Sequence, residues 1–145
     1  RQESVKNGLD NLPSNASKVL IHDGARCLIQ SNLIDKCAYE MRDSDASVLA
    51  VKVTDTIKVV DEENFIENTP NRDNLWAAQT PQGFSVSKLK DAHEKAIKNN
   101  WIVTDDASLF ERLNFPVKVI EGNPLNIKIT TPFDLKIAEL LLNDY

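Results

Sequence analysis

The chain contains few of the residues that build metal sites and disulfide frameworks. Its 145 residues include only two cysteines and two histidines. Cys27 and Cys37 do not form a CxxC pair, so neither a zinc site nor a disulfide framework is indicated. No apolar run approaches the roughly 20 residues that a membrane helix needs, and no basic-then-apolar signal segment opens the chain. We therefore expect no membrane partner and a cytoplasmic location, or the plastid stroma in a eukaryote.

Glycine and net positive charge are also scarce. The four glycines do not cluster into a loop that could cradle a triphosphate. The chain carries 17 basic and 22 acidic residues, a net charge of −5, which argues against a nucleic-acid binder. A cleft in an acidic protein can still focus positive charge on a small anionic ligand. The composition is otherwise that of a globular protein, and its length suits one domain, residues 1–145.

Strand-like and helix-like patterns alternate along the chain. This alternation predicts an α/β fold with a Rossmann-like, mostly parallel sheet. The expected strands are residues 18–22, 46–53, 76–79, 116–121 and 126–129, and the strand at 76–79 should stop at Pro81. Helices are expected to begin at Ser31, at Ser85 or Ser87, near Thr104, and at Thr131, where a cap residue, a proline and an acid follow one another. In the last helix Leu135, Ala138 and Leu142 should face inward.

A hairpin interrupts this rhythm. Residues 56–60 and 65–67 read as two strands, and they flank the acidic segment Asp61-Glu62-Glu63-Asn64. We therefore expect one domain with a projecting β-hairpin arm at about residues 54–74.

The loop after the first strong strand is the first candidate for a ligand site. In open α/β sheets, ligands bind at the carboxyl ends of the strands. There, Asp23 could hold a metal or a sugar hydroxyl, Gly24 permits close backbone approach and Arg26 could reach a phosphate. An ordinary Asp-Gly turn beside a surface arginine would explain the same residues equally well. His22 is expected to end the strand and to form local hydrogen bonds.

This loop is the first of five motifs that occur in a definite order. They are His22–Arg26 (HDGAR), Val53–Lys58 (VTDTIK), Arg72–Phe84 (RDNLWAAQTPQGF), Thr104–Ser108 (TDDAS) and Asn126–Thr130 (NIKIT). In this order the sequence resembles the 2-C-methyl-D-erythritol 4-phosphate cytidylyltransferase family from the first helix to the last. Residues 76–84 are the most specific part of the match. Cys27 departs from the family, which usually has proline after this arginine.

The resemblance implies a reaction in which a phosphate oxygen of methylerythritol phosphate attacks the α-phosphorus of CTP and pyrophosphate leaves. It implies Mg²⁺ as cofactor, held by Asp23, and a homodimer in which each arm embraces the other subunit. Asp23, Arg72 and Lys128 would be catalytic, with Arg72 acting in the partner's site. The implied substrate-binding residues are Ser4, Gly24, Arg26, Thr56, Thr80, Thr104 and Asp105, of which Ser4 would contact the cytidine.

Simpler interpretations exist for several of these residues. Thr104 is also a good helix cap, Lys58 and Lys128 could be solvated strand residues, and Arg72 could be a surface turn charge. The charge distribution favours the functional interpretation. Basic residues accompany the ligand-type loops, whereas acidic residues gather at the hairpin tip.

The strand and glycine-rich loop with which the family begins have no counterpart here. We therefore expect an N-terminally truncated enzyme whose 145 residues alone do not turn over. A cytidylyltransferase acting on ribitol 5-phosphate is one alternative, and a non-catalytic dimeric remnant of the fold is another.

Overall fold

The computed structural model describes residues 2–143 of the chain, and its elements alternate as the sequence predicts. In chain order they are α1 (Gln2–Asp10), β1 (Lys18–Ile21), α2 (Ser31–Glu40), β2 (Ala46–Lys52), β3 (Val59–Val60), β4 (Ile66–Asn68), the 3₁₀ turn η1 (Arg72–Asn74), β5 (Trp76–Ser85), α3 (Val86–Lys98), α4 (Ala107–Arg112), β6 (Lys118–Glu121) and α5 (Pro132–Asn143). None of the described helices is long and apolar enough to cross a membrane.

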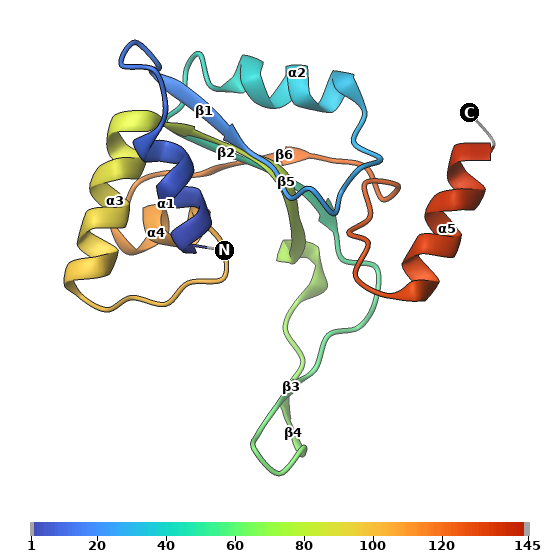
Figure 1. The fold of residues 1–145 in the computed structure, drawn as a ribbon. Helices are drawn as coiled ribbons and strands as arrows, with labels where there is room; N and C mark the ends of the chain where they lie inside the picture. Colours follow the sequence, from blue (N-terminus) through green and yellow to red (C-terminus); the bar gives the residue numbers. More distant parts are fainter. Residues whose placement is uncertain (1, 144–145) are drawn as a thin grey trace.

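The central sheet has the strand order β1-β5-β2-β6 (Figure 1). The β2–β6 pair is parallel, but β5 is antiparallel to both of its neighbours, β1 and β2. Thus β1, β2 and β6 run in one direction and β5 runs in the other. Two of the three neighbouring strand pairs are antiparallel, so the expectation of a mostly parallel sheet is wrong for the strand pairs. The cause is the hairpin arm. It returns the chain directly beside β2, and such a return produces an antiparallel neighbour, whereas a parallel one needs a crossover.

The sheet separates two apolar layers. Ala46 and Val48 of β2 pack with Phe84 of β5 against α1, α3 and α4. Leu49, which follows Val48 in sequence, packs instead with Cys37 of α2 and with Ile120. This alternation follows from the period of two along a strand. Figure 1 shows α2 along one face of the sheet and α1, α3 and α4 on the other. The two layers hold the sheet rigid beneath the loops that form the site.

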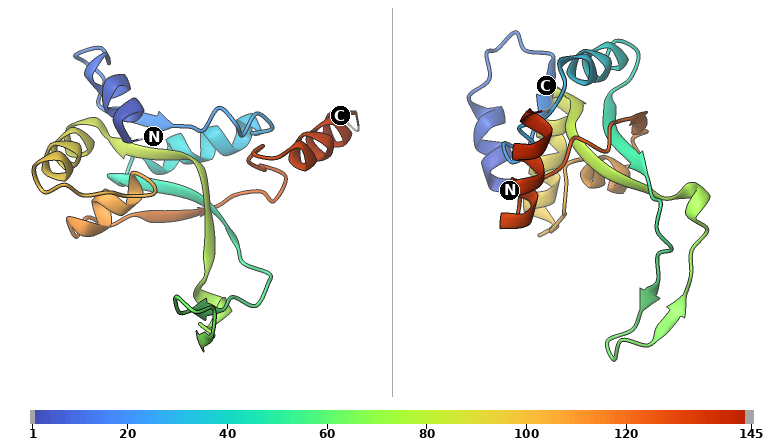
Figure 2. Two further views of the ribbon diagram at one scale, coloured as in Figure 1. Left: turned by 60° about the horizontal axis from the view of Figure 1, so that its bottom comes forward. Right: turned by 90° about the vertical axis from the view of Figure 1, so that its right-hand side faces the viewer.

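The hairpin is present as predicted. β3 and β4 pair in antiparallel fashion, with Val59 opposite Asn68 and Val60 opposite Ile66. Figures 1 and 2 show this arm extending away from the sheet and its helices. Phe65 and Ile66 are 67% and 62% exposed at its end. The arm therefore carries apolar side chains that residues 2–143 leave exposed.

Three expectations about the elements are wrong. β5 continues through Pro81 to Ser85, residues 126–129 form no strand, and the residue that caps α2 is Gln30, with Ser31 already helical. The start of α5 is as predicted, but its inward face is not. Ala138 is buried, whereas Leu135 and Leu142 are 50% and 59% exposed. Figure 2 shows α5 set apart from the sheet. Its Leu141 and Leu142 face a hollow that residues 27–30 also line, whereas Phe133 and Leu140 are exposed like Leu135.

Candidate functional site

The predicted residues meet in a cleft of about 220 Å³ beside the carboxyl end of β1. The loop after β1, the middle of β5 and two later loops enclose it. Its lining residues are Asp23, Arg26, Ala78, Gln79, Thr80, Gln82, Thr104, Asp105 and Lys128. Six of the ten residues that the sequence indicates thus come together, from four separate segments of the chain.

One carboxylate with two cations forms the charged centre of the cleft. Lys128 Nζ lies 3.1 Å from Asp23 Oδ2, and Arg26 Nε lies 3.9 Å from the same oxygen. The guanidinium of Arg26 also donates to the carbonyl oxygens of Asn126 (2.7 Å) and Ala78 (3.4 Å). Burial lowers the pKa of Arg26, and the neighbouring carboxylate of Asp23 opposes that shift. Arg26 is therefore anchored to the main chain, while Lys128, with its side chain 45% exposed, can turn toward a ligand.

Thr80 connects β5 to the Asp23 loop. Its Oγ1 accepts a hydrogen bond from the main-chain N–H of Asp23 at 2.9 Å. The same oxygen lies 3.0 Å from His22 Nδ1. On the other side of the ring, His22 Nε2 lies 3.1 Å from the carbonyl oxygen of Arg26. His22 thus makes the local hydrogen bonds expected of it, and it ties both ends of the loop to the sheet.

Asp105 closes the opposite side of the cleft and also orders the start of α4. Its Oδ1 accepts from the N–H and the hydroxyl of Ser108, at 3.1 and 2.6 Å. Its Oδ2 accepts from Gln82 Nε2 at 2.9 Å. The residue that caps α4 is Asp106, so the alternative role of Thr104 as the helix cap is not what the structure has. Thr104 lines the cleft instead.

A buried amide network supports the cleft from behind, and sequence reasoning missed it. Asn126 is 1% exposed, and its Nδ2 donates to Gln79 Oε1 (3.2 Å) and to the carbonyl oxygen of Thr80 (2.9 Å). Gln79 Nε2 donates in turn to the carbonyl oxygen of Asn123 at 2.9 Å. The available signal was the pair of glutamines, Gln79 and Gln82, which lie on either side of Thr80 and Pro81 in β5.

An irregularity in the sheet brings these polar side chains to the cleft. Val48 pairs with Gln82 and Ala50 pairs with Ala78, so residues 79–81 all lie opposite Leu49. Irregularities of this kind re-aim side chains and often accompany functional sites. The backbone of β5 thus turns Thr80 and Gln79 toward the site.

Four predicted residues do not line this cleft. Ser4 lines a separate groove of about 290 Å³ between α1 and β1, which also includes His22. Gly24 is in the Asp23 loop, and a Cβ there would meet nothing within 4 Å. Thr56 and Arg72 belong to the arm, where Arg72 Nη1 donates to the carbonyl oxygen of Thr54 at 2.6 Å. Neither residue lines the cleft within one chain, and the arm extends away from the sheet (Figure 1).

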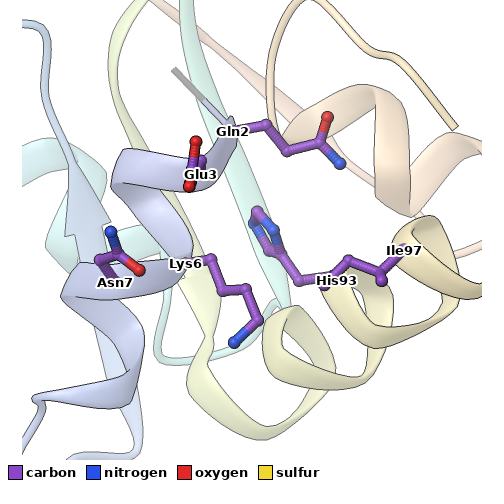
Figure 3. Close-up of a pocket in the computed structure, with 6 residues that line it drawn as sticks. All are labelled: Gln2, Glu3, Lys6, Asn7, His93 and Ile97. Carbon is purple, nitrogen blue, oxygen red and sulfur yellow. The ribbon is translucent and has the colours of Figure 1, made fainter. Parts of the chain in front are cut away.

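A larger hollow of about 520 Å³ between α1 and α3 contains none of the predicted residues (Figure 3). His93 points into it from α3, and Lys6 lies across from it on α1. His93 Nε2 is 2.9 Å from Asp106 Oδ1, and both side chains are almost fully buried. This pair links α3 to α4. Among residues 2–143 no three His, Cys, Asp or Glu side chains are grouped so as to hold a metal by themselves.

Known proteins match this chain along its whole length. The model of the 2-C-methyl-D-erythritol 4-phosphate cytidylyltransferase family matches residues 1–144. A curated protein of that name from Prochlorococcus marinus (strain MIT 9515) is 70% identical over all 145 residues, and the chain spans 65% of its length. The crystal structure of 4-diphosphocytidyl-2C-methyl-D-erythritol synthase from Anaerococcus prevotii DSM 20548 is 36% identical, with a TM-score of 0.93 over 99% of this chain and 64% of that one.

A second solved structure agrees. The 2-C-methyl-D-erythritol 4-phosphate cytidylyltransferase from Thermus thermophilus is 33% identical, with a TM-score of 0.88 over 98% of this chain and 69% of that one. These matches confirm the resemblance found in the five motifs and the α/β fold that it implies. The chain belongs to the 2-C-methyl-D-erythritol 4-phosphate cytidylyltransferase family.

Proposed function

We propose that this chain is the polyol-phosphate-binding part of an enzyme that joins CTP to 2-C-methyl-D-erythritol 4-phosphate. The observation that carries the proposal is the cleft in which Asp23, Arg26, Thr80, Asp105 and Lys128 converge. It offers cations for a phosphate and carboxylates and hydroxyls for a polyol within one small volume. The relatives that share this fold are named for the same reaction.

In the proposed reaction, a phosphate oxygen of methylerythritol phosphate forms a new bond to the α-phosphorus of CTP. The bond from that phosphorus to the β-phosphate bridging oxygen breaks, and pyrophosphate leaves with the electron pair. Lys128 holds the attacking phosphate and offsets its charge, while Arg26 fixes the Asp23 loop against the sheet. Such transfers depend mainly on positioning and charge stabilisation, which are the two things these residues supply.

Mg²⁺ fits the residues present. Magnesium in nucleotide sites is commonly bound through one or two carboxylates together with substrate phosphates. Asp23 offers one such carboxylate, which is 18% exposed and now lies next to Lys128. When bound there, the ion would neutralise charge that develops on the phosphates. A site with a single protein carboxylate is in keeping with the absence of a three-residue metal cluster among residues 2–143.

We further propose that two copies form a homodimer through their arms. The exposed apolar residues of the arm, Val60, Phe65 and Ile66, support this. In such a dimer Thr56 and Arg72 would come from one subunit to the cleft of the other, which a single chain cannot arrange. The arrangement would place a further cation beside the bound phosphate. We place the reaction in the cytoplasm.

The test is calorimetric binding of methylerythritol phosphate to the chain, with ribitol 5-phosphate as the competing ligand. We expect methylerythritol phosphate to bind more tightly. Lys128→Met should weaken binding about 10- to 100-fold, the range for losing one charge-assisted hydrogen bond. Lys98→Met, at an exposed position in α3, is the matched control and should leave the affinity unchanged. Preferential binding of ribitol 5-phosphate, or equal effects of both lysine variants, would contradict the proposal.

Pyrophosphate release from CTP is measured in parallel. Because the four glycines of the chain form no triphosphate-binding cluster, we expect binding of the polyol phosphate without turnover from these 145 residues. Turnover at the rate of the relatives would show that the triphosphate is held in another way.

A further inference from the structure

His22, Thr80 and the Asp23 loop form a continuous chain of hydrogen bonds whose donors and acceptors can be assigned. The chain begins at the Asp23 N–H, passes through Thr80 Oγ1 and the His22 ring, and ends at the carbonyl oxygen of Arg26. Its three donor–acceptor distances are 2.9, 3.0 and 3.1 Å. Two of its four groups belong to the main chain and have fixed roles, because an amide N–H only donates and a carbonyl oxygen only accepts.

The main-chain groups determine the roles of the side chains between them. The carbonyl oxygen of Arg26 requires that His22 Nε2 carries a hydrogen and donates it. In a neutral imidazole the other nitrogen is then an acceptor. In this neutral form His22 Nδ1 accepts, and the hydroxyl hydrogen of Thr80 points toward it. The Thr80 oxygen already accepts from the Asp23 N–H, so it has one lone pair left and no hydrogen to donate.

We propose that His22 is a positioning residue that makes Thr80 an acceptor toward the cleft, so that Thr80 recognises a hydroxyl of the polyol and not its phosphate. This inference rests on the function proposed above. Phosphate oxygens at neutral pH are acceptors, so a second acceptor facing them gives no hydrogen bond. A polyol hydroxyl, in contrast, can donate to the remaining lone pair of Thr80.

The rest of the cleft is consistent with this division. Lys128 is the donor with an exposed side chain, and its Nζ beside Asp23 marks the place where phosphate oxygens can bind. Asp105 lies on the Gln82 side and offers carboxylate oxygens, which also favour hydroxyl donors. The ligand would thus bind with its phosphate toward Lys128 and its hydroxyls toward Thr80 and Asp105. His22 thus fixes the direction of the Thr80 hydroxyl hydrogen, and that direction determines whether the phosphate or a hydroxyl of the ligand binds at Thr80.

The first experiment needs no ligand. The chain contains only two histidines, His22 and His93, so long-range hydrogen–nitrogen correlation NMR of the labelled protein reports both rings with little ambiguity. We expect His22 to carry its hydrogen on Nε2 and none on Nδ1. Thr80→Val should shift the Nδ1 signal of His22 and leave His93 unchanged, whereas Thr80→Ser keeps the hydroxyl and should shift neither. A hydrogen found on Nδ1 of His22 would overturn the assignment.

The second experiment separates positioning from a merely structural role. His22→Gln can still donate to the carbonyl oxygen of Arg26 but offers Thr80 no acceptor at the Nδ1 position, whereas His22→Asn places its oxygen near that position. We expect His22→Gln to weaken methylerythritol phosphate binding about 10-fold, with the binding of inorganic phosphate unchanged. His22→Asn should retain most of the affinity for methylerythritol phosphate.

The outcomes distinguish this inference from the proposed function. Equal weakening of both ligands in His22→Gln would mean that the ring only holds the loop, and it would overturn the positioning role. A wild-type chain that binds no methylerythritol phosphate would refute the proposed function. The hydrogen position on His22 would still be decided by the NMR experiment in that case.

Discussion

Gly83 lies on β5 between two neighbouring strands, and Gly83→Ala should destabilise the fold. It pairs with Leu20 of β1 on one side and with Ser47 of β2 on the other. A Cβ on Gly83 would lie 2.8 Å from Met41 Cγ, 2.9 Å from Met41 Sδ and 2.9 Å from Ser47 Oγ. Met41 and Ser47 are both buried, and Ser47 Oγ is already within 3.3 Å of Cys37 Sγ. Because both side chains are buried, either would have to shift within a filled layer.

The expected cost follows from this packing. Inserting a methyl group into a filled core costs about 1–3 kcal/mol, and three contacts under 3 Å place Gly83→Ala in the upper part of that range. Gly8→Ala is the matched control. Gly8 is exposed in α1, and a Cβ there would meet nothing within 4 Å. Alanine at a helical position is favoured over glycine by about 0.5–1 kcal/mol, so Gly8→Ala should stabilise.

The assay is urea denaturation of both variants beside the wild type. A change in midpoint at constant slope reports a change in stability. The same substitution should therefore move the midpoint in opposite directions at the two sites. Gly83→Ala with the midpoint of the wild type would refute the packing argument. It would mean that Met41 has space that the structure does not show.

Four further predictions concern other parts of the chain. Asp134 accepts hydrogen bonds from Thr130 and Thr131, which lowers its pKa from 3.8 to about 2. Its stabilisation of α5 is therefore complete above about pH 4 and is lost as the pH falls through 2. Asp134→Asn should remove this acid dependence from the amide hydrogen exchange of α5. His93→Leu leaves the buried Asp106 without its histidine donor and should cost about 1–3 kcal/mol in the same denaturation assay; a neutral result would mean that Asp106 finds a substitute. Cys27 is exposed, whereas burial raises the pKa of the Cys37 thiol, so a thiol reagent should modify Cys27 quickly and Cys37 only after unfolding. Phe65→Ser should weaken self-association in sedimentation experiments. It should change the stability of the chain little, because Phe65 belongs to the arm and not to the core. Unchanged association would contradict the dimer proposal.

Much of the site could be predicted because its residues belong to short ordered motifs. Asp23, Thr80, Asp105 and Lys128 lie in loops or on β5 at positions that the motifs mark, and the fold brings them to one cleft. Gln79 and Asn126 also lie in these motifs, but the hydrogen bond between them could not be predicted in this way. Their contact depends on the irregular pairing opposite Leu49, and pairing register is a property of two strands together.

The direction of β5 and the position of α5 were missed for a related physical reason. The cap of α5 is local, and the sequence Thr131-Pro132-Phe133-Asp134 was enough to predict it. Which face of α5 is covered depends on what lies beside it, and among residues 2–143 little does. Likewise, the apolar pattern of β5 does not reveal that it returns from a hairpin.

The charges in the cleft explain why the arm matters for the proposed chemistry. Two basic residues, Arg26 and Lys128, face two acidic ones, Asp23 and Asp105, so the lining of one chain is neutral overall. The expected concentration of positive charge is therefore only partly present, since Lys58 and Arg72 lie in the arm, where they bond to Thr69 and to Thr54. A phosphate monoester carries about 1.5 to 2 negative charges at neutral pH, and Arg26 already donates to two carbonyl oxygens. Binding that phosphate tightly requires a further cation. Arg72 from a partner arm or a magnesium ion on Asp23 would supply it, so mutation of Arg72 should weaken phosphate binding most where metal is absent.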